Sequence, residues 1–134
     1  MFKISIIILI QDTFVIENIK SFKEMVEQLV KPILYNYWRS GSSWRVRCVL
    51  HWKGIDYEYR VVDTSKSQQN QEEYHKLNPF ERIPTLLVDG LTLAESVAIC
   101  EYLDETRKEK PLLPTEPGKR AIVRQLCEIL NSGV

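Results

Sequence analysis

Small residues gather in one short segment of the chain, where Ser40, Gly41, Ser42 and Ser43 precede residues with helical periodicity. The N-terminus of a helix presents backbone N–H groups that lack intrahelical acceptors, and it carries about half a positive charge. Such a site stabilises a thiolate relative to its thiol and lowers the pKa of the sulfur, and a serine hydroxyl adds another donor. The segment therefore suits activation of a sulfur nucleophile, although a serine-rich turn without a chemical role is the alternative.

Two further segments carry groups that could hold a ligand. Ser96 follows Glu95 at the expected start of a later helix. There its hydroxyl and the first N–H groups suit a carboxylate, or simply cap the helix. Ile83 and Pro84 precede an apolar run, and the sequence does not decide between the cis and trans isomers of their bond.

The predicted strands and helices place these residues at the ends of elements. Residues 32–38 are aromatic and β-branched and predict a strand. Ser43 is expected to cap a helix over residues 44–53, which Gly54 ends. An apolar stripe supports this helix: Val46, Val49 and Leu50. Residues 57–62 alternate like a half-buried strand, and the βαβ spacing predicts that the two strands are parallel.

The remaining elements complete the order β-α-β-α-β-β-α. A polar stretch leads into a short helix that ends near Leu77, and residues 83–93 predict two strands around Asp89-Gly90, a strong hairpin signal. A helical face follows, formed by Ile99, Cys100 and Leu103. This order predicts an α/β, thioredoxin-like fold, which many functions share.

Residues 1–30 differ from the rest of the chain. The apolar run Ile4–Ile10 is too short to span a bilayer, and no small-x-small cleavage site follows it, so we expect no secretion signal. Ser21 and Glu24 have capping-box spacing ahead of an amphipathic pattern that includes Phe22, Val26 and Leu29. We interpret this region as an appended extension.

Composition and cysteine spacing exclude several classes of function. The 134 residues include 18 basic and 18 acidic ones, so no broad positive field is expected to attract nucleic acid or an anionic membrane. Three cysteines, Cys48, Cys100 and Cys127, form no CxxC pair, and His51 and His75 lack partners at metal spacing. We therefore expect a reducing, cytoplasmic location, no metal, and cysteines that pack as small hydrophobic residues.

The same motifs resemble a known family. The sequence from Lys31 to about Arg124 resembles the N-terminal domain of zeta-class glutathione transferases, also called maleylacetoacetate isomerases. The resemblance is carried by "YWRSGSSWRVR", "GIDYEY", "LNPFERIPTLLVDG", "LAESVAICEYLDET" and "PLLPTEPGKRA". It implies an extension over 1–30, a thioredoxin-like glutathione-binding domain over 31–113, and a linker with the first helix of a mostly absent all-helical domain over 114–134.

The resemblance also implies the catalytic residues. Ser40 matches the serine whose hydroxyl donates to the sulfur of glutathione, and Ser42 stands where the family has cysteine, as a second catalytic candidate. Gly41 replaces a family serine but keeps its N–H group. We expect activation of glutathione to survive these changes, while the efficiency of isomerisation is the property they put in question.

Other positions would bind the rest of glutathione. A cis bond between Ile83 and Pro84 would expose the backbone that pairs with the cysteinyl residue. Ser96 would hold the γ-glutamyl carboxylate, Glu95 the ammonium group, and Gln69 is a weaker candidate for the glycyl end.

Three arginines lie near the serine turn. Arg39 is the candidate for attracting the carboxylate of a substrate, whereas Arg45 and Arg47 are expected to be solvated or to face another subunit. The aromatic residues Tyr35, Tyr37 and the three tryptophans are expected in a core or an interface.

The function implied by the resemblance is glutathione-dependent isomerisation of maleylacetoacetate to fumarylacetoacetate, in phenylalanine and tyrosine catabolism, with transfer of glutathione to α-haloacids. The alternative is a truncated, non-catalytic module that binds glutathione or a protein. A glutaredoxin-like exchanger ranks last, because no cysteine lies in the first helical turn. We also expect a homodimer, because an apolar stripe needs a cover: Ile122, Leu126, Ile129 and Leu130.

Overall fold

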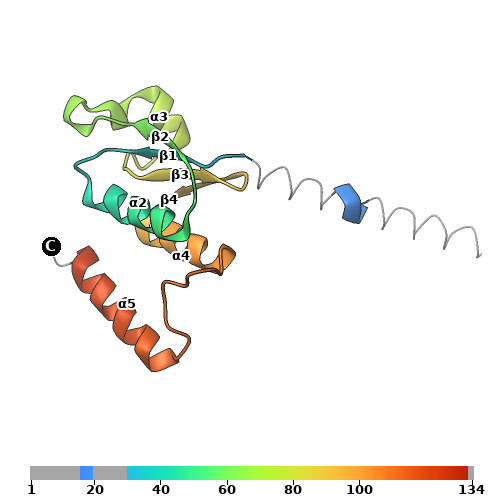
Figure 1. Ribbon diagram of the computed structural model, residues 1–134. Coiled ribbons are helices and arrows are strands. Elements are labelled where there is room, and N and C mark those ends of the chain that lie inside the picture. Colours follow the sequence, from blue (N-terminus) through green and yellow to red (C-terminus); the bar gives the residue numbers. More distant parts are fainter. Residues whose placement is uncertain (1–15, 20–29, 133–134) are drawn as a thin grey trace, which may run out of the picture.

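A four-stranded mixed sheet forms the centre of the molecule in the computed structural model, which describes residues 16–19 and 30–132 (Figure 1). The strands are β1 (Ile33–Asn36), β2 (Glu58–Val61), β3 (Thr85–Val88) and β4 (Leu91–Ala94), in the order β2-β1-β3-β4. β1 is parallel to β2 and antiparallel to β3, which pairs with β4. The predicted thioredoxin-like fold is confirmed. The features expected within residues 4–10 and 21–29 lie outside the described residues.

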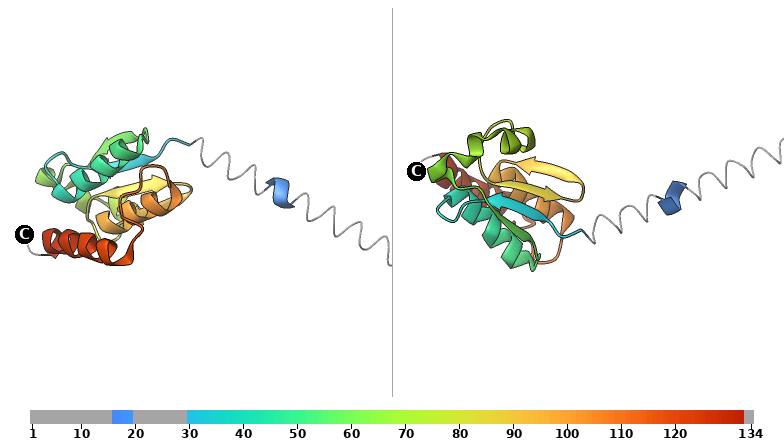
Figure 2. Two further views of the ribbon diagram at one scale, coloured as in Figure 1. Left: turned by 60° about the horizontal axis from the view of Figure 1, so that its bottom comes forward. Right: turned by 90° about the horizontal axis from the view of Figure 1, so that it is seen from above.

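Helices cover both faces of this sheet. α2 (Gly41–Lys53) and α4 (Ser96–Thr106) lie on one face, and α3 (Glu72–Leu77) lies on the other (Figures 1 and 2). Two 3-10 turns, η1 (Thr64–Lys66) and η2 (Gln68–Asn70), connect β2 to α3. The core lies between the sheet and the α2–α4 layer: Leu34, Val46, Val49, Leu50, Leu86, Val88, Ile99 and Leu103.

The start of α2 differs from the prediction, because Ser40 caps the helix and Ser43 does not. Ser40 has extended backbone angles, φ −77° and ψ 120°, and its Oγ accepts the N–H of Ser43 at 3.1 Å. Ser43 is a fully buried residue of the first turn. The helix therefore begins at Gly41, which leaves the first N–H groups beside the small residues of the turn. Gly54 ends α2 as predicted, with φ 71°.

β2 also differs from the prediction, which gave it one buried face. All four of its residues are exposed, because β2 is an edge strand, and only Val62, which follows it, is buried. The hairpin is confirmed: Asp89 and Gly90 have φ values of 53° and 74°, as a type I′ turn requires.

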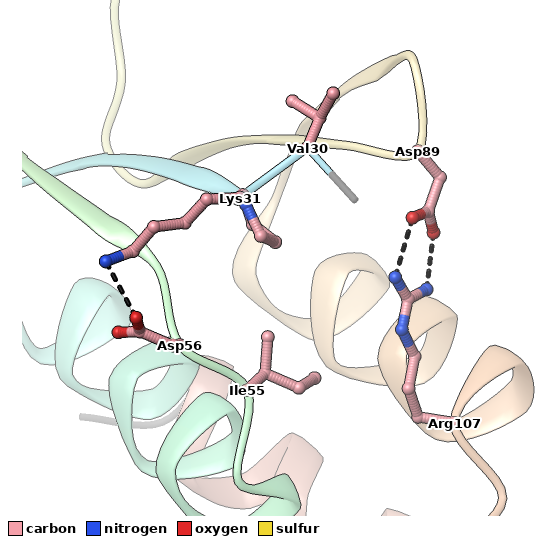
Figure 3. Close-up of a pocket in the computed structure, with 7 residues that line it drawn as sticks. Val30, Lys31, Ile55, Asp56, Asp89 and Arg107 are labelled. Atoms are coloured by element: carbon pink, nitrogen blue, oxygen red, sulfur yellow. Dashed lines mark hydrogen bonds and ion pairs between the residues drawn. The ribbon is translucent and has the colours of Figure 1, made fainter. Parts of the chain in front are cut away.

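Two ion pairs lie at one end of the sheet and join segments outside the strands. At the end where β1 begins, Lys31 Nζ lies 2.8 Å from Asp56 Oδ2, and Arg107 Nη2 donates to Asp89 Oδ1 at 2.7 Å (Figure 3). Arg107 Nη1 donates to the second oxygen of Asp89, so this pair is bidentate and ties the β3–β4 turn to the end of α4.

The last helix, α5 (Pro117–Ser132), follows an irregular connection and lies beside the α2–α4 layer (Figures 1 and 2). The apolar stripe predicted on it is exposed as expected: Ile122 58%, Leu126 57%, Ile129 56% and Leu130 65%. Within the described ranges, no helix combines the length and apolar character needed to cross a bilayer.

Candidate functional site

Strand register brings the predicted site residues to one end of the central strands, which we call the site edge. Tyr35 of β1 pairs with Thr85 of β3, and Thr85 pairs with Ala94 of β4. The loop that follows β1, the Ile83–Pro84 bond before β3, and Glu95 after β4 therefore lie at the same edge. Three segments that are far apart in the sequence thus meet where α2 and α4 begin.

Ser40 stands at the N-terminus of α2 with donors around it. The first intrahelical hydrogen bond runs from Trp44 N to Ser40 O at 2.9 Å, so the N–H groups of Gly41 and Ser42 precede the helical ladder. Ser40 Oγ accepts the Ser43 N–H, which leaves the hydroxyl hydrogen of Ser40 available for donation. An anion placed beyond this turn would meet a hydroxyl donor, two backbone N–H groups and the positive end of the helix.

The two residues that depart from the family pattern leave this end of the helix open. No atom lies within 4 Å of a Cβ built on Gly41, so a serine side chain would fit there. Ser42 is exposed, whereas Ser43 is buried and its Oγ has no partner among the described residues.

Arg47 holds the loop that presents Ser40. Its Nη1 donates to the buried Asn36 Oδ1 at 2.8 Å and to Tyr37 O at 3.2 Å, and its Nη2 donates to Trp38 O at 3.2 Å. One guanidinium thus donates hydrogen bonds to the side chain of the last residue of β1 and to two loop carbonyls. The expectation that Arg47 is simply solvated is wrong, because these acceptors turn its side chain back onto its own loop, while a position facing another subunit stays a prediction.

Arg45 reaches the second helix start. Its Nη1 donates to Ser96 Oγ at 2.6 Å and to Asn131 Oδ1 of α5 at 3.2 Å. Ser96 is 6% exposed and is the first residue of α4. The expectation of a solvated Arg45 is therefore also wrong. The alternation of arginine and valine in the sequence gave no sign that either guanidinium group is paired.

Glu95 precedes Ser96 in an uncommon backbone conformation. Its φ of 66° and ψ of 111° lie outside the regions that side-chain-bearing residues favour, and its side chain is exposed. No side-chain hydrogen bond from Glu95 caps α4, so its carboxylate is available to a ligand at this edge.

The Ile83–Pro84 bond is cis, as the resemblance implied. Residues of α3 and its end hold the flanking segment: Tyr74 Oη donates to Arg82 O at 2.6 Å, and Asn78 Nδ2 donates to Arg82 O at 2.8 Å. Tyr74 and Asn78 also contact Thr85 Oγ1 on the other side of the proline. The sequence alone did not predict this network, because no local pattern links α3 to the residues before β3.

Two candidates remain, Gln69 for the glycyl end of glutathione and Arg39 for the carboxylate of a substrate. Gln69 lies in η2 after β2, and its Oε1 is buried without a hydrogen-bond partner among the described residues. Arg39 is exposed, and its guanidinium lies 5.6 Å from the centre of the Trp38 ring. Both follow strands that end at the site edge, but among the described residues neither side chain forms a hydrogen bond with Ser40 or Ser96.

The expectation that the cysteines pack as small hydrophobic residues is wrong for two of the three. Cys48 and Cys127 are exposed, and only Cys100 packs partly against the core. Trp38, Trp44 and Trp52 are 68%, 63% and 55% exposed, so none of them belongs to the core, and their expected place in an interface stays a prediction.

The comparison with known proteins agrees with this geometry. Residues 31–105 match the family model of the glutathione S-transferase N-terminal domain. The chain belongs to this family. Within the family it is 50% identical over 107 residues to a probable maleylacetoacetate isomerase 2 of Drosophila melanogaster, covering 78% of this chain and 47% of the relative. It is also 50% identical over 109 residues to the maleylacetoacetate isomerase of Rattus norvegicus, covering 80% of this chain and 50% of that protein.

Solved structures of family members are similar as well. A holo structure of maleyl pyruvate isomerase, described as a bacterial glutathione S-transferase in the zeta class, matches with a TM-score of 0.73 and 38% identity over 75% of this chain and 47% of its own. A glutathione transferase homologue from Drosophila mojavensis with bound glutathione matches with a TM-score of 0.71 and 32% identity, over 77% of this chain and 48% of its own. The chain thus spans about half the length of the curated relatives it matches.

Proposed function

We propose that this chain binds glutathione at the edge formed by Ser40, Pro84 and Ser96 and activates its thiol, and that the activity served is isomerisation of maleylacetoacetate to fumarylacetoacetate. The main support is the position of Ser40 at the N-terminus of α2. The chain is also 50% identical over 109 residues to a maleylacetoacetate isomerase. Phenylalanine and tyrosine catabolism would use this reaction.

The residues present fit glutathione in charge and in hydrogen bonding. The Ser40 hydroxyl and the N–H groups of Gly41 and Ser42 would face the sulfur. The hydroxyl of Ser96, with Arg45 behind it, would face the γ-glutamyl carboxylate, and Glu95 would accept from the ammonium group. The backbone of Ile83 would pair with the cysteinyl residue, and Gln69 is assigned to the glycyl end.

Glutathione, when bound, supplies a thiolate that adds reversibly to a conjugated double bond and so permits rotation about it. The protein stabilises this anion through Ser40 and the end of α2, which lowers the pKa of the thiol. Arg39 would attract the carboxylate of the electrophile, and α-haloacids are further candidate substrates. Reaction geometry is set by the rigid ends of α2 and α4.

Two organisational proposals accompany the activity. Residues 31–113 form the glutathione-binding domain, and residues 114–134 begin a helical domain that contributes to the electrophile pocket, with residues 1–30 as an extension. Two copies associate as a homodimer in the cytoplasm.

Titration of bound glutathione tests the central claim. The ultraviolet absorbance of the thiolate, followed against pH, should give a thiol pKa well below that of free glutathione. Ser40→Ala should return the pKa towards the free value and weaken the cap of α2 by about 1 kcal/mol, whereas Ser40→Thr keeps a hydroxyl and a cap and should largely preserve both. An unshifted pKa in the wild-type complex would exclude activation at this helix.

Restoring the family residue at position 42 tests the second catalytic candidate. Ser42 is exposed at the same end of α2, so Ser42→Cys should fold normally. A gain in isomerisation with no change in glutathione affinity would assign a role in the chemical step to this position. Equal rates would show that the thiol is dispensable.

A non-catalytic glutathione-binding module is the second candidate, favoured by Gly41 and Ser42, which stand where the family has serine and cysteine. Retention on immobilised glutathione, together with no isomerisation of maleylacetoacetate at any glutathione concentration, would support it. Turnover that depends on added glutathione would exclude it.

A further inference from the structure

Three helices bring the free cysteines Cys48, Cys100 and Cys127 together. They belong to α2, α4 and α5 respectively, and α5 lies beside the layer that the other two form (Figure 1). Nothing in the proposed reaction uses these thiols. Their positions in the sequence give no sign of this grouping, which arises only because α5 folds back.

Polar contacts determine which face of α5 turns towards the core. Asn131 accepts a hydrogen bond from Arg45 of α2 at 3.2 Å, and Arg124 Nε lies 3.8 Å from Glu101 Oε1 of α4. Positions 124, 127 and 131 share one face of a helix. Cys127 is therefore about one turn from each contact, and it faces the seam between α2 and α4.

Cys100 and Cys127 line the same hollow in this seam. The hollow has a volume of ≈ 510 Å³ and is largely apolar, with Val49, Val97 and Leu112 among its walls. Cys100 is partly buried and Cys127 is exposed. A small reagent from solvent therefore has readier access to Cys127 than to Cys100.

The Cys100 thiol is a weaker acid than an ordinary cysteine. Burial raises the pKa of the Cys100 thiol to about 11, Arg45 opposes this increase, and charges on Cys127, Cys48 and Glu101 add to it. Cys127 and Cys48 thus lie within electrostatic range of Cys100. Because the raised pKa leaves little thiolate at Cys100 near neutral pH, Cys100 is poorly suited to react first with a peroxide.

We propose that Cys127 and Cys100 form an intramolecular disulfide that ties α5 to α4 when the chain meets a peroxide. Cys127 as thiolate attacks the O–O bond, which breaks to give a sulfenic acid at Cys127 and hydroxide, later protonated to water. Cys100 loses its proton and attacks the sulfenic sulfur, the S–O bond breaks, and a second water leaves. Two thiols are oxidised and one hydrogen peroxide is reduced to two waters.

The bond would replace weak attachments with a covalent one. In residues 30–132, α5 contacts the α2–α4 layer through only two polar interactions, and the Arg124 and Glu101 side chains are 57% and 49% exposed. Exposed pairs of this kind hold a helix only weakly. A disulfide would keep Asn131 against Arg45, and so would also steady the guanidinium that contacts Ser96.

Peptide mapping of the full chain tests the proposal. The chain is treated with hydrogen peroxide, blocked with N-ethylmaleimide and digested with trypsin without reductant. Each cysteine falls in its own tryptic peptide: 48–53, 83–107 and 125–134. We expect a link between peptides 83–107 and 125–134 that reduction abolishes, with peptide 48–53 unlinked.

Matched variants and isotope labelling separate this bond from others. Cys48→Ser should leave the yield of the link unchanged, whereas Cys127→Ser, which alters an exposed side chain, and Cys100→Ala should abolish it. In a mixture of ¹⁴N- and ¹⁵N-labelled chains, only peptides with the same label should be linked. A link to Cys48, links between differently labelled chains, or Cys127 recovered without a partner would overturn the proposal.

Proteolysis of the folded chain gives a second measurement. Oxidation should slow tryptic cleavage after Arg124 several-fold, because α5 opens less often when it is tethered. The rate for Cys127→Ser should be insensitive to oxidation. Equal cleavage rates for the oxidised and reduced wild-type chain would contradict the tether.

Discussion

Arg45 Nη1 donates a hydrogen bond of 2.6 Å to Ser96 Oγ, and this contact joins α2 to the first residue of α4. Because the guanidinium is the donor, the hydroxyl hydrogen of Ser96 remains free to donate to a carboxylate. A carboxylate bound there would also meet the positive charge of Arg45. Arg45 is thus suited to position the proposed γ-glutamyl site without touching the sulfur.

Replacement of Arg45 should weaken glutathione binding without changing thiol activation. Arg45→Met removes a charge-assisted hydrogen bond, so we expect the Kd for glutathione, measured by calorimetry, to rise about tenfold. The pKa of the bound thiol should stay where it is, since Ser40 is untouched. Arg124→Met makes the same change on α5 and should leave the Kd unaltered. A shifted thiol pKa in Arg45→Met would argue against a purely positioning role.

Replacement of Arg47, in contrast, should change the pKa of the bound thiol and the stability of the fold. Arg47→Met removes the donor to Asn36 Oδ1 and to two carbonyls of the loop before Ser40. We expect the free energy of unfolding to fall by about 2 kcal/mol and the pKa of bound glutathione to rise, because Ser40 is held less firmly. Urea unfolding and thiol titration measure the two effects. Arg47→Lys keeps the charge but not the fork, and full recovery in that variant would contradict the geometric explanation.

Acid should break the bidentate ion pair between Arg107 and Asp89. Hydrogen bonding from Arg107 holds the pKa of Asp89 below its ordinary value, against the effect of partial burial. A depressed pKa in the folded state means that the pair stabilises the fold above the unfolded pKa of roughly 4, and that this stability is lost as pH falls through the folded pKa.

Asp89→Asn removes the carboxylate that pairs with Arg107 and that also accepts a hydrogen bond from Tyr102 Oη at 2.7 Å. Asparagine tolerates the positive φ of the turn, so the hairpin should persist, and the variant should lose about 1–2 kcal/mol near pH 7. The difference from the wild type should shrink in urea unfolding as the pH falls below the unfolded pKa of roughly 4 and then through the lower folded pKa. Asp56→Asn, in the exposed pair with Lys31, should change little at any pH. A pH-independent difference for Asp89→Asn would contradict the linkage.

The exposed stripe of α5 should control self-association. Leu126→Glu and Leu130→Glu place charges in the middle of this face, where both leucines are more than half exposed. We expect the mass measured by light scattering to fall to that of a monomer, with the free energy of unfolding of the residues 31–105 domain unchanged. Glu128→Gln, on the same helix, is the control and should not alter the mass. A monomeric wild-type chain would contradict the proposed homodimer.

Sequence periodicity and turn residues were enough to predict the order of elements, the Asp89-Gly90 hairpin, the end of α2 at Gly54 and the apolar stripe of α5. Each of these depends on residues close in the chain, whose backbone preferences act before any tertiary contact forms. The same local reasoning placed the cap of α2 at Ser43 instead of Ser40, because several serines in one turn are equivalent until the path of the backbone is known.

Tertiary structure alone decided which of these pieces form a site. Arg45 meets Ser96, and Arg47 meets Asn36, because α2 packs between α4 and the end of β1. The exposure of β2 depends on its place at the sheet edge, and the meeting of Cys100 with Cys127 depends on how α5 folds back. A guanidinium or a thiol has no preference for a partner within its own turn, so its role follows from whichever distant element the completed core brings within reach.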